Sequence, residues 1–295
     1  MIAPHQFLLV VALCAVACHH SEPSDIEKHL DVISRAEMTF GVPDRARLAG
    51  IQAAYAELVR AAGPLDRINN HDLSLLFEGA YREAFYMHHA ATIREATALL
   101  DAMQKRGIAT DEHYRKMYET FIGARMFDEA RALAKRHSVP DLEEAPDLRE
   151  AVLLPGQPTK MVVDPTARVL LRRSVDLHPV QVVVVSHPRC HFSENAMRDI
   201  QADPVLRTAF LEHATWLAPQ HDNLEFDAIQ RWNREHPGMQ HAIAYRNDEW
   251  PMIDSWGTPT FYVIKGGVVS AKVEGWDGEG SRDKLIAGLR EVGLL

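Results

Sequence analysis

Residues 180–200 read VQVVVVSHPRCHFSENAMRDI and carry the strongest structural signal in the chain. Residues 180–185 form a nearly continuous β-branched run, which is typical of a central strand buried on both faces. After a short loop, residues 194–200 have helical spacing. Cys190 therefore lies where a buried strand is followed by a helix. Unpaired backbone N–H groups and the positive end of the helix dipole meet there, and both lower the pKa of a cysteine.

A second motif lies further along the chain. Residues 256–264 read WGTPTFYVI and predict a strand that opens after Thr-Pro-Thr. The glycines of residues 265–269 (KGGVV) predict a tight turn into a second strand. Residues 284–292 then place apolar side chains at helical spacing, which predicts an amphipathic closing helix.

In this order, the two motifs resemble the thioredoxin fold, and in detail the periplasmic TlpA-like and thioredoxin-like proteins. In that family a Cys motif lies between a central strand and a helix, and Thr-Pro lies opposite it. The resemblance covers residues 159–295. It implies a thioredoxin-like α/β domain, with a central mixed sheet flanked by helices, behind an all-α helical-hairpin domain.

The resemblance also implies roles for single residues. Cys190 takes the place of the nucleophilic first Cys of Cys-x-x-Cys, and Ser193 takes the place of the resolving Cys, so the motif reads CHFS. Pro259 takes the place of the cis-proline, and Thr258 that of the preceding residue, whose backbone pairs with bound substrate in the family. The usual Trp before the motif is missing, and residues 188–189 (PR) stand there instead.

Other residues are expected around the thiol. His187 and Arg189 are expected to support the thiolate electrostatically. Trp256, His191 and Phe192 are expected to line the substrate cleft. No cofactor and no resident metal ion are expected.

Cys190 is expected to be the only free thiol, because Cys14 leaves with a signal peptide and Cys18 is lipidated. It cannot close an intramolecular disulfide, but it can attack a disulfide, form a mixed disulfide and await an external thiol. The leading hypothesis is therefore a single-thiol disulfide oxidoreductase acting on protein thiols. Whether the protein turns over as an enzyme stays open.

Three other interpretations stay open. The first is a non-catalytic binding or scaffold protein, because buried unreactive cysteines are common. The second is a copper chaperone, since His187, Cys190 and His191 offer imidazole and thiolate ligands. The third is a peroxidase, although the Pro-x-x-x-Thr-x-x-Cys motif of peroxiredoxins is absent.

The N-terminus indicates export. Residues 7–18 (FLLVVALCAVAC) form an apolar run that suits a signal peptide and is too short to span a bilayer of about 30 Å. Residues 15–18 (AVAC) resemble a bacterial lipoprotein box, which implies a lipid anchor on Cys18. Because His19 rather than Asp follows, we expect a periplasm-facing outer-membrane lipoprotein of the cell envelope. An ordinary cleaved signal and an uncleaved anchor are the alternatives.

The expected organisation has five parts: a signal peptide (1–18), a tether (19–25), a helical domain (26–139), a linker (140–158) and a thioredoxin-like domain (159–295). Residues 99–137 resemble one and a bit tetratricopeptide- or pentatricopeptide-type helix hairpins; an irregular helical bundle is the alternative. Residues 160–163 and 169–175 flank an Asp-Pro turn and predict a β-hairpin. Residues 204–255 form an insertion longer than a minimal thioredoxin domain requires.

The length, charge and motif content of the chain disfavour several classes of function. The length of 295 residues suggests about two domains. A net charge of −9 argues against a nucleic-acid partner, because phosphate binding depends on clustered Lys and Arg. No Gly-rich phosphate loop or nucleophile elbow is visible, which disfavours nucleotide-dependent enzymes and hydrolases.

Overall fold

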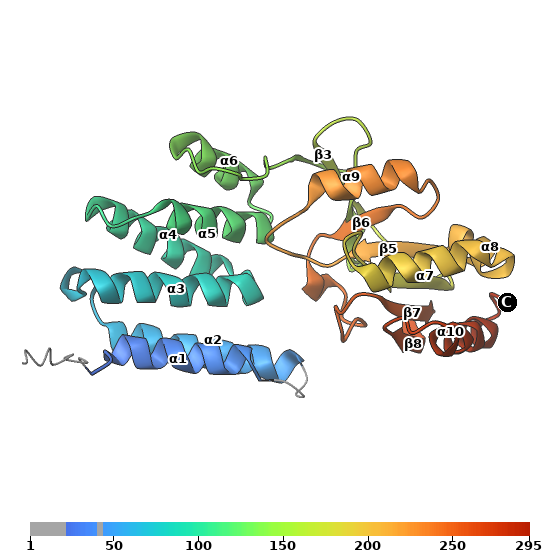
Figure 1. Cartoon of the computed structure of the whole chain (residues 1–295), viewed down its shortest axis with the longest axis horizontal. Helices are drawn as coiled ribbons and strands as arrows, with labels where there is room; N and C mark the ends of the chain where they lie inside the picture. Colours follow the sequence, from blue (N-terminus) through green and yellow to red (C-terminus); the bar gives the residue numbers. More distant parts are fainter. Residues whose placement is uncertain (1–21, 40–43) are drawn as a thin grey trace, which may run out of the picture.

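The computed structural model describes residues 22–39 and 44–295. The expected signal peptide, with Cys14 and Cys18, and residues 19–21 of the tether lie outside these residues. The first part is helical, and Figure 1 shows its helices stacked beside the α/β part. These helices are α1 (Asp25–Glu37), α2 (Asp44–Ala62), η1 (Leu65–Arg67), α3 (Asn70–Met87), α4 (Ala90–Lys105), α5 (Asp111–Gly123) and α6 (Phe127–Arg136).

Local capping explains where several of these helices begin. The side chain of Ser24 accepts a hydrogen bond from the backbone N–H of Glu27 at the start of α1, and Asn69 accepts one from Asp72 at the start of α3. The predicted helical spacing is confirmed: Ile26 is buried on α1. The segment that resembles a helix-hairpin repeat, 99–137, forms the end of α4, all of α5 and α6.

The second part is built on one mixed sheet with the order β1-β3-β2-β6-β5-β4-β7-β8. Strands β4, β5 and β6 run parallel, and β2 and β7 pair antiparallel at either side of them. The strands are β1 (Asp147–Glu150), β2 (Thr159–Val163), β3 (Val169–Ser174), β4 (Gln181–Val185), β5 (Ala214–Ala218), β6 (His241–Ala244), β7 (Thr260–Lys265) and β8 (Val268–Glu274). The helices are α7 (His191–Ala202), α8 (Pro204–His213), α9 (Phe226–Glu235) and α10 (Glu279–Val292), with η2 (Asn247–Glu249).

The expected fold class is confirmed: a helical part precedes an α/β part built on a mixed sheet, in which strand β4 leads to α7. The β2–β3 hairpin is also confirmed, and the carboxylate of Asp164 caps its turn by accepting the N–H groups of Thr166 and Ala167. The segment expected as a linker, 140–158, contains β1, which pairs with β3 at the sheet edge. The insertion 204–255 supplies α8, β5, α9 and β6.

Both faces of β4 are covered. Val182 and Val184 pack against α7, α8 and α10, whereas Val183 and Val185 pack against a cluster that contains Trp250. This alternation follows from the two-residue side-chain period of a strand. A third apolar cluster joins the helical part to the sheet, because it contains residues of α1–α6 together with residues of β2, β3, α9 and β6.

Arg125, in the loop between α5 and α6, connects the helical part to the α/β part through hydrogen bonds. Its guanidinium donates to the backbone carbonyls of Tyr245 at 3.0 Å, Ala244 at 2.9 Å and His221 at 3.3 Å. Burial lowers the pKa of Arg125 to about 9, so the group stays protonated at neutral pH. A buried cation is tolerated here because carbonyl oxygens surround it.

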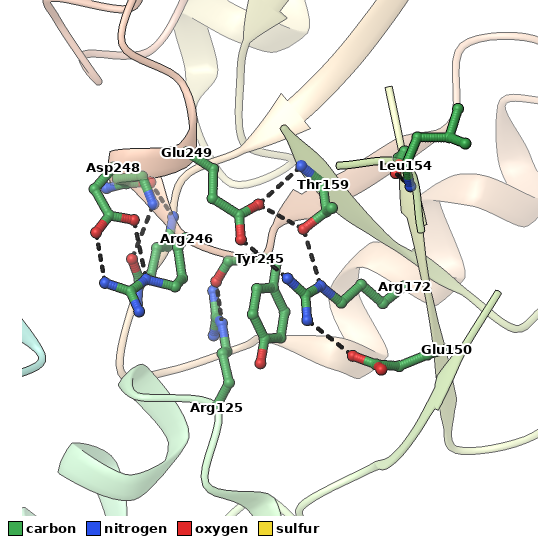
Figure 2. Close-up of polar contacts among 12 residues, drawn as sticks. Arg125, Glu150, Leu154, Thr159, Arg172, Tyr245, Arg246, Asp248 and Glu249 are labelled. Carbon is green, nitrogen blue, oxygen red and sulfur yellow. Dashed lines mark hydrogen bonds and ion pairs between the residues drawn. The ribbon is translucent and has the colours of Figure 1, made fainter. Parts of the chain in front are cut away.

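Figure 2 shows the polar network beside this contact. The carboxylate of Glu249 accepts hydrogen bonds from the backbone and hydroxyl of Thr159 and pairs with Arg172 at 3.0 Å. Arg172 also pairs with Glu150 and lies 3.4 Å from the ring centroid of Tyr245. The network therefore ties η2, at the end of the insertion, to strands β1, β2 and β3.

Replacement of Arg125 by Met is predicted to lower the free energy of unfolding by about 3 kcal/mol, because buried carbonyls lose their charged donor. The matched control is Arg246→Met, since Arg246 is half exposed and pairs with Asp248 on the surface. That change is expected to cost at most about 1 kcal/mol. Urea unfolding followed by tryptophan fluorescence measures both; equal losses would contradict an anchoring role for Arg125.

Candidate functional site

Cys190 lies at the start of α7 and is its N-cap residue. The backbone N–H of Cys190 donates to the carbonyl of His187 at 2.9 Å and closes a turn after β4. Across the site, Thr258 and Pro259 are joined by a cis peptide bond, as the thioredoxin resemblance implies. The Cys190 thiol donates to the Thr258 carbonyl at 3.3 Å. The structure thus brings together the Cys motif and the Thr-Pro motif, far apart in the sequence.

The environment of Cys190 favours its thiolate. Burial raises the pKa of the thiol. Hydrogen bonds from the side chains of Thr258 and Ser193 and from the backbone N–H groups of Ser193 and Phe192 lower that pKa, and the net direction is downward. The Ser193 side chain is buried, and while Cys190 is a thiol its hydroxyl has no hydrogen-bond partner among the described residues. A buried hydroxyl without another partner gains a strong bond when the sulfur ionises.

His187 and Arg189 face a third residue, Glu225. The Arg189 Nε lies 2.6 Å from Glu225 Oε2, and the His187 Nε2 lies 3.7 Å from the same oxygen. Burial lowers the pKa of His187, against the opposing effect of the Glu225 carboxylate. The pKa of Cys190 is lowered by hydrogen bonds from Thr258 and from Ser193 and Phe192 at the start of α7, whereas His187 and Arg189, the two expected supports, face Glu225.

The three residues expected to line the cleft differ in exposure. Phe192 is 56% exposed, and His191 beside it is exposed and hydrogen-bonds to Asn195. An exposed aromatic ring next to the thiol offers an apolar contact to a partner. Trp256 is only partly buried and packs against the apolar cluster that contains Trp250.

Hydrogen bonds hold the loop that carries Thr258. The Tyr262 hydroxyl donates to Asp254 at 2.8 Å and accepts the backbone N–H of Ser255 at 2.9 Å. The Thr260 hydroxyl donates to the carbonyl of Gly257 at 2.7 Å. These contacts fix the backbone on either side of the cis bond, so the Thr258 carbonyl has a defined place beside the sulfur.

The described residues contain no group of three or more His, Cys, Asp or Glu side chains arranged to hold a metal ion. Within the same ranges, no helix combines the length and apolar character needed to cross a membrane. A cavity of about 630 Å³ lies away from Cys190, against α5, α6 and residues 138–145. Cys190 itself is only partly buried at the protein surface.

Glu225 is the site residue that sequence reasoning missed. It lies in the insertion, directly before α9, and no local pattern marks it. Its carboxylate reaches the Cys190 turn only because β5 and α9 fold back beside β4.

Alkylation of Cys190 by iodoacetamide is predicted to be half-maximal below the pH of about 8.5 expected for an ordinary cysteine, because the reagent reacts with the thiolate. Ser193→Ala is expected to move the midpoint to higher pH, since the thiolate loses a donor. Ser186→Ala, also buried but bonded to His241, is the control and leaves the midpoint unchanged. Mass spectrometry of timed reactions measures the profile, and coinciding wild-type and Ser193→Ala curves would contradict the assignment.

Comparison with known proteins gives little. No family model and no curated protein matches the chain. A solved structure described as a thioredoxin-like protein from Bacteroides caccae ATCC 43185 aligns with 97% of this chain and 99% of its own, at 11% identity and a TM-score of 0.31. A likeness at this level carries no argument about fold or function, which rest on the geometry described above.

Proposed function

We propose that the protein carries out thiol–disulfide exchange with protein partners in the cell envelope, through Cys190. The observation that carries the proposal is the sulfur's position at the N-terminus of α7. There the Ser193 hydroxyl and two backbone N–H groups lower the thiol pKa, and the Thr258 carbonyl lies 3.3 Å away. This arrangement supports a TlpA-like protein with a Cys-x-x-Ser motif.

The exchange balances without any added oxidant. The Cys190 thiolate attacks one sulfur of a partner disulfide; the partner S–S bond breaks as the new S–S bond to Cys190 forms. The released partner thiolate takes a proton from water. An external thiol is needed to resolve the mixed disulfide, because Ser193 has no sulfur. Its thiolate attacks the partner sulfur; a disulfide between the two forms as the bond to Cys190 breaks, and Cys190 leaves as the thiolate. The direction of net reaction depends on that external thiol.

The surroundings of the sulfur suit an extended polypeptide. The Thr258 backbone lies beside Cys190 and can pair with a bound segment, and the exposed Phe192 ring offers an apolar contact. A one-thiol copper site is less well supported. The Nδ1 of His187 accepts the backbone N–H of Arg189 at 3.2 Å, so only its Nε2 is open to a metal ion, and that nitrogen lies 3.7 Å from Glu225 Oε2.

The exchange proposal predicts a mixed disulfide. Purified wild-type protein mixed with a disulfide-containing, unfolded polypeptide is expected to give an adduct on non-reducing gels that disappears with dithiothreitol. Cys190→Ala abolishes it, and Phe192→Ala weakens it severalfold by removing the apolar contact. If the same envelope proteins co-purify equally with wild type and Cys190→Ala, and no adduct forms, the protein is a binding or scaffold protein.

We also propose that the protein is exported and anchored to the outer membrane by a lipid on Cys18, facing the periplasm. The support is the apolar run of residues 7–18 and the AVAC sequence. In a bacterial host, wild type is expected to incorporate labelled palmitate and to fractionate with the outer membrane. Cys18→Ala loses the label; label retained by Cys18→Ala, or absent from wild type, would contradict lipidation. Cys190→Ala, which keeps the label, is the control.

A further inference from the structure

Glu225 is a partly buried carboxylate beside the reactive loop. Its side chain is 17% exposed, and its Oε2 is shielded from solvent. Taking a carboxylate out of water is unfavourable unless charged groups compensate it. The charge that compensates it is Arg189, one residue before Cys190. Because the Glu225–Arg189 ion pair lies next to the thiol, we considered a role for it in the reactivity of Cys190.

The backbone holds Glu225 in place. Its φ angle is 48°, in the left-handed region that long side chains rarely adopt. The side chain of Asn223 accepts its backbone N–H at 3.1 Å, and its carbonyl accepts the N–H of Ile229 in the first turn of α9. A residue held in a sparsely populated conformation at a site is a reason to look for function.

The contacts of Glu225 define the charges around the Cys190 turn. Oε2 lies 2.6 Å from Arg189 Nε and 3.7 Å from His187 Nε2. Because His187 Nδ1 accepts the Arg189 backbone N–H, the ring hydrogen of neutral His187 lies on Nε2, the nitrogen that is 3.7 Å from the carboxylate. His187 and Cys190 are the first and fourth residues of one turn, so their Cα atoms lie within about 7 Å.

We propose that Glu225 is a positioning residue that sets the reactivity of Cys190, by neutralising Arg189 and orienting His187 on the turn that carries the thiol. Without the carboxylate, the Arg189 charge is unbalanced and favours the thiolate. With it, the thiolate is favoured by the hydrogen bonds from Thr258 and from the start of α7. This matters because a thiol that ionises too easily is a weaker nucleophile, and exchange is fastest when its pKa is near the ambient pH.

The proposal depends on the proposed function for its purpose, but its test concerns the thiol alone. The groups that face His187 are Glu225 before α9, Arg189 in its own turn, His221 in the preceding loop and His241 on β6. Across the turn, α7 carries the exposed pair of Glu194 and Arg198. Glu225 differs from Glu194 because it contacts the turn itself and is shielded from water.

The test compares iodoacetamide alkylation of Cys190 from pH 5 to 9 in full-length variants. Glu225→Gln keeps the shape of the side chain and is expected to raise the rate at pH 6.5 about fivefold, with the midpoint moving to lower pH. Arg189→Gln leaves the carboxylate unbalanced and is expected to lower the rate by a similar factor. The double variant returns close to wild type, because both members of the pair are absent.

The opposite rate changes expected for Glu225→Gln and Arg189→Gln distinguish an effect of charge from a loss of structure in the turn. If the turn merely came loose, both single variants would move the profile the same way, and that result overturns the proposal; coinciding wild-type and Glu225→Gln profiles do so too. Glu194→Gln is the matched control and is expected to stay within about twofold of wild type, because water screens its exposed pair. Circular dichroism at each pH checks that every variant is folded. Failure of Cys190 to form mixed disulfides would leave this result intact and refute only the proposed exchange.

Discussion

The complete burial of β4 is the constraint on which the rest of the structure depends. Every residue from Gln181 to Val185 is buried, so both faces of this strand must be covered. Its alternating valines meet α7, α8 and α10 on one side and the Trp250 cluster on the other. After the strand, the buried Ser186 leads into the turn of residues 187–190 that carries Cys190. The thiol therefore follows a strand that is buried along its whole length.

The insertion has two consequences for this framework. It adds β6 between β5 and β2, which extends the sheet towards the helical part, where Arg125 donates to the carbonyls of Ala244 and Tyr245. It also brings Glu225 against the Cys190 turn. One segment thus joins the helical part and the thiol site, and the polar network in Figure 2 holds its far end to β2 and β3.

Much of the site could be predicted from the sequence. A strand of β-branched residues followed by helical spacing places a cysteine at a helix start, which is a local pattern. That Thr-Pro lies opposite this cysteine was implied by the resemblance to the thioredoxin fold. The contact between Cys190 and Thr258 agrees with them. The roles assigned to His187 and Arg189 depended on where their side chains turn, which no local pattern specifies. In the structure both face Glu225.

The sequence by itself determined the helical first part, the β4–α7 junction and the cis-proline loop, because each follows from hydrophobic periodicity or a motif of adjacent residues. Only the tertiary structure decided that residues 147–150 form an edge strand, that Arg125 binds carbonyls of the insertion, and that Glu225 lies beside Arg189. The physical reason is the distance along the sequence between the residues that interact. A strand run or a helix repeat is a property of neighbouring residues, whereas an ion pair or a buried guanidinium depends on segments that meet only after the sheet has formed and its faces are covered.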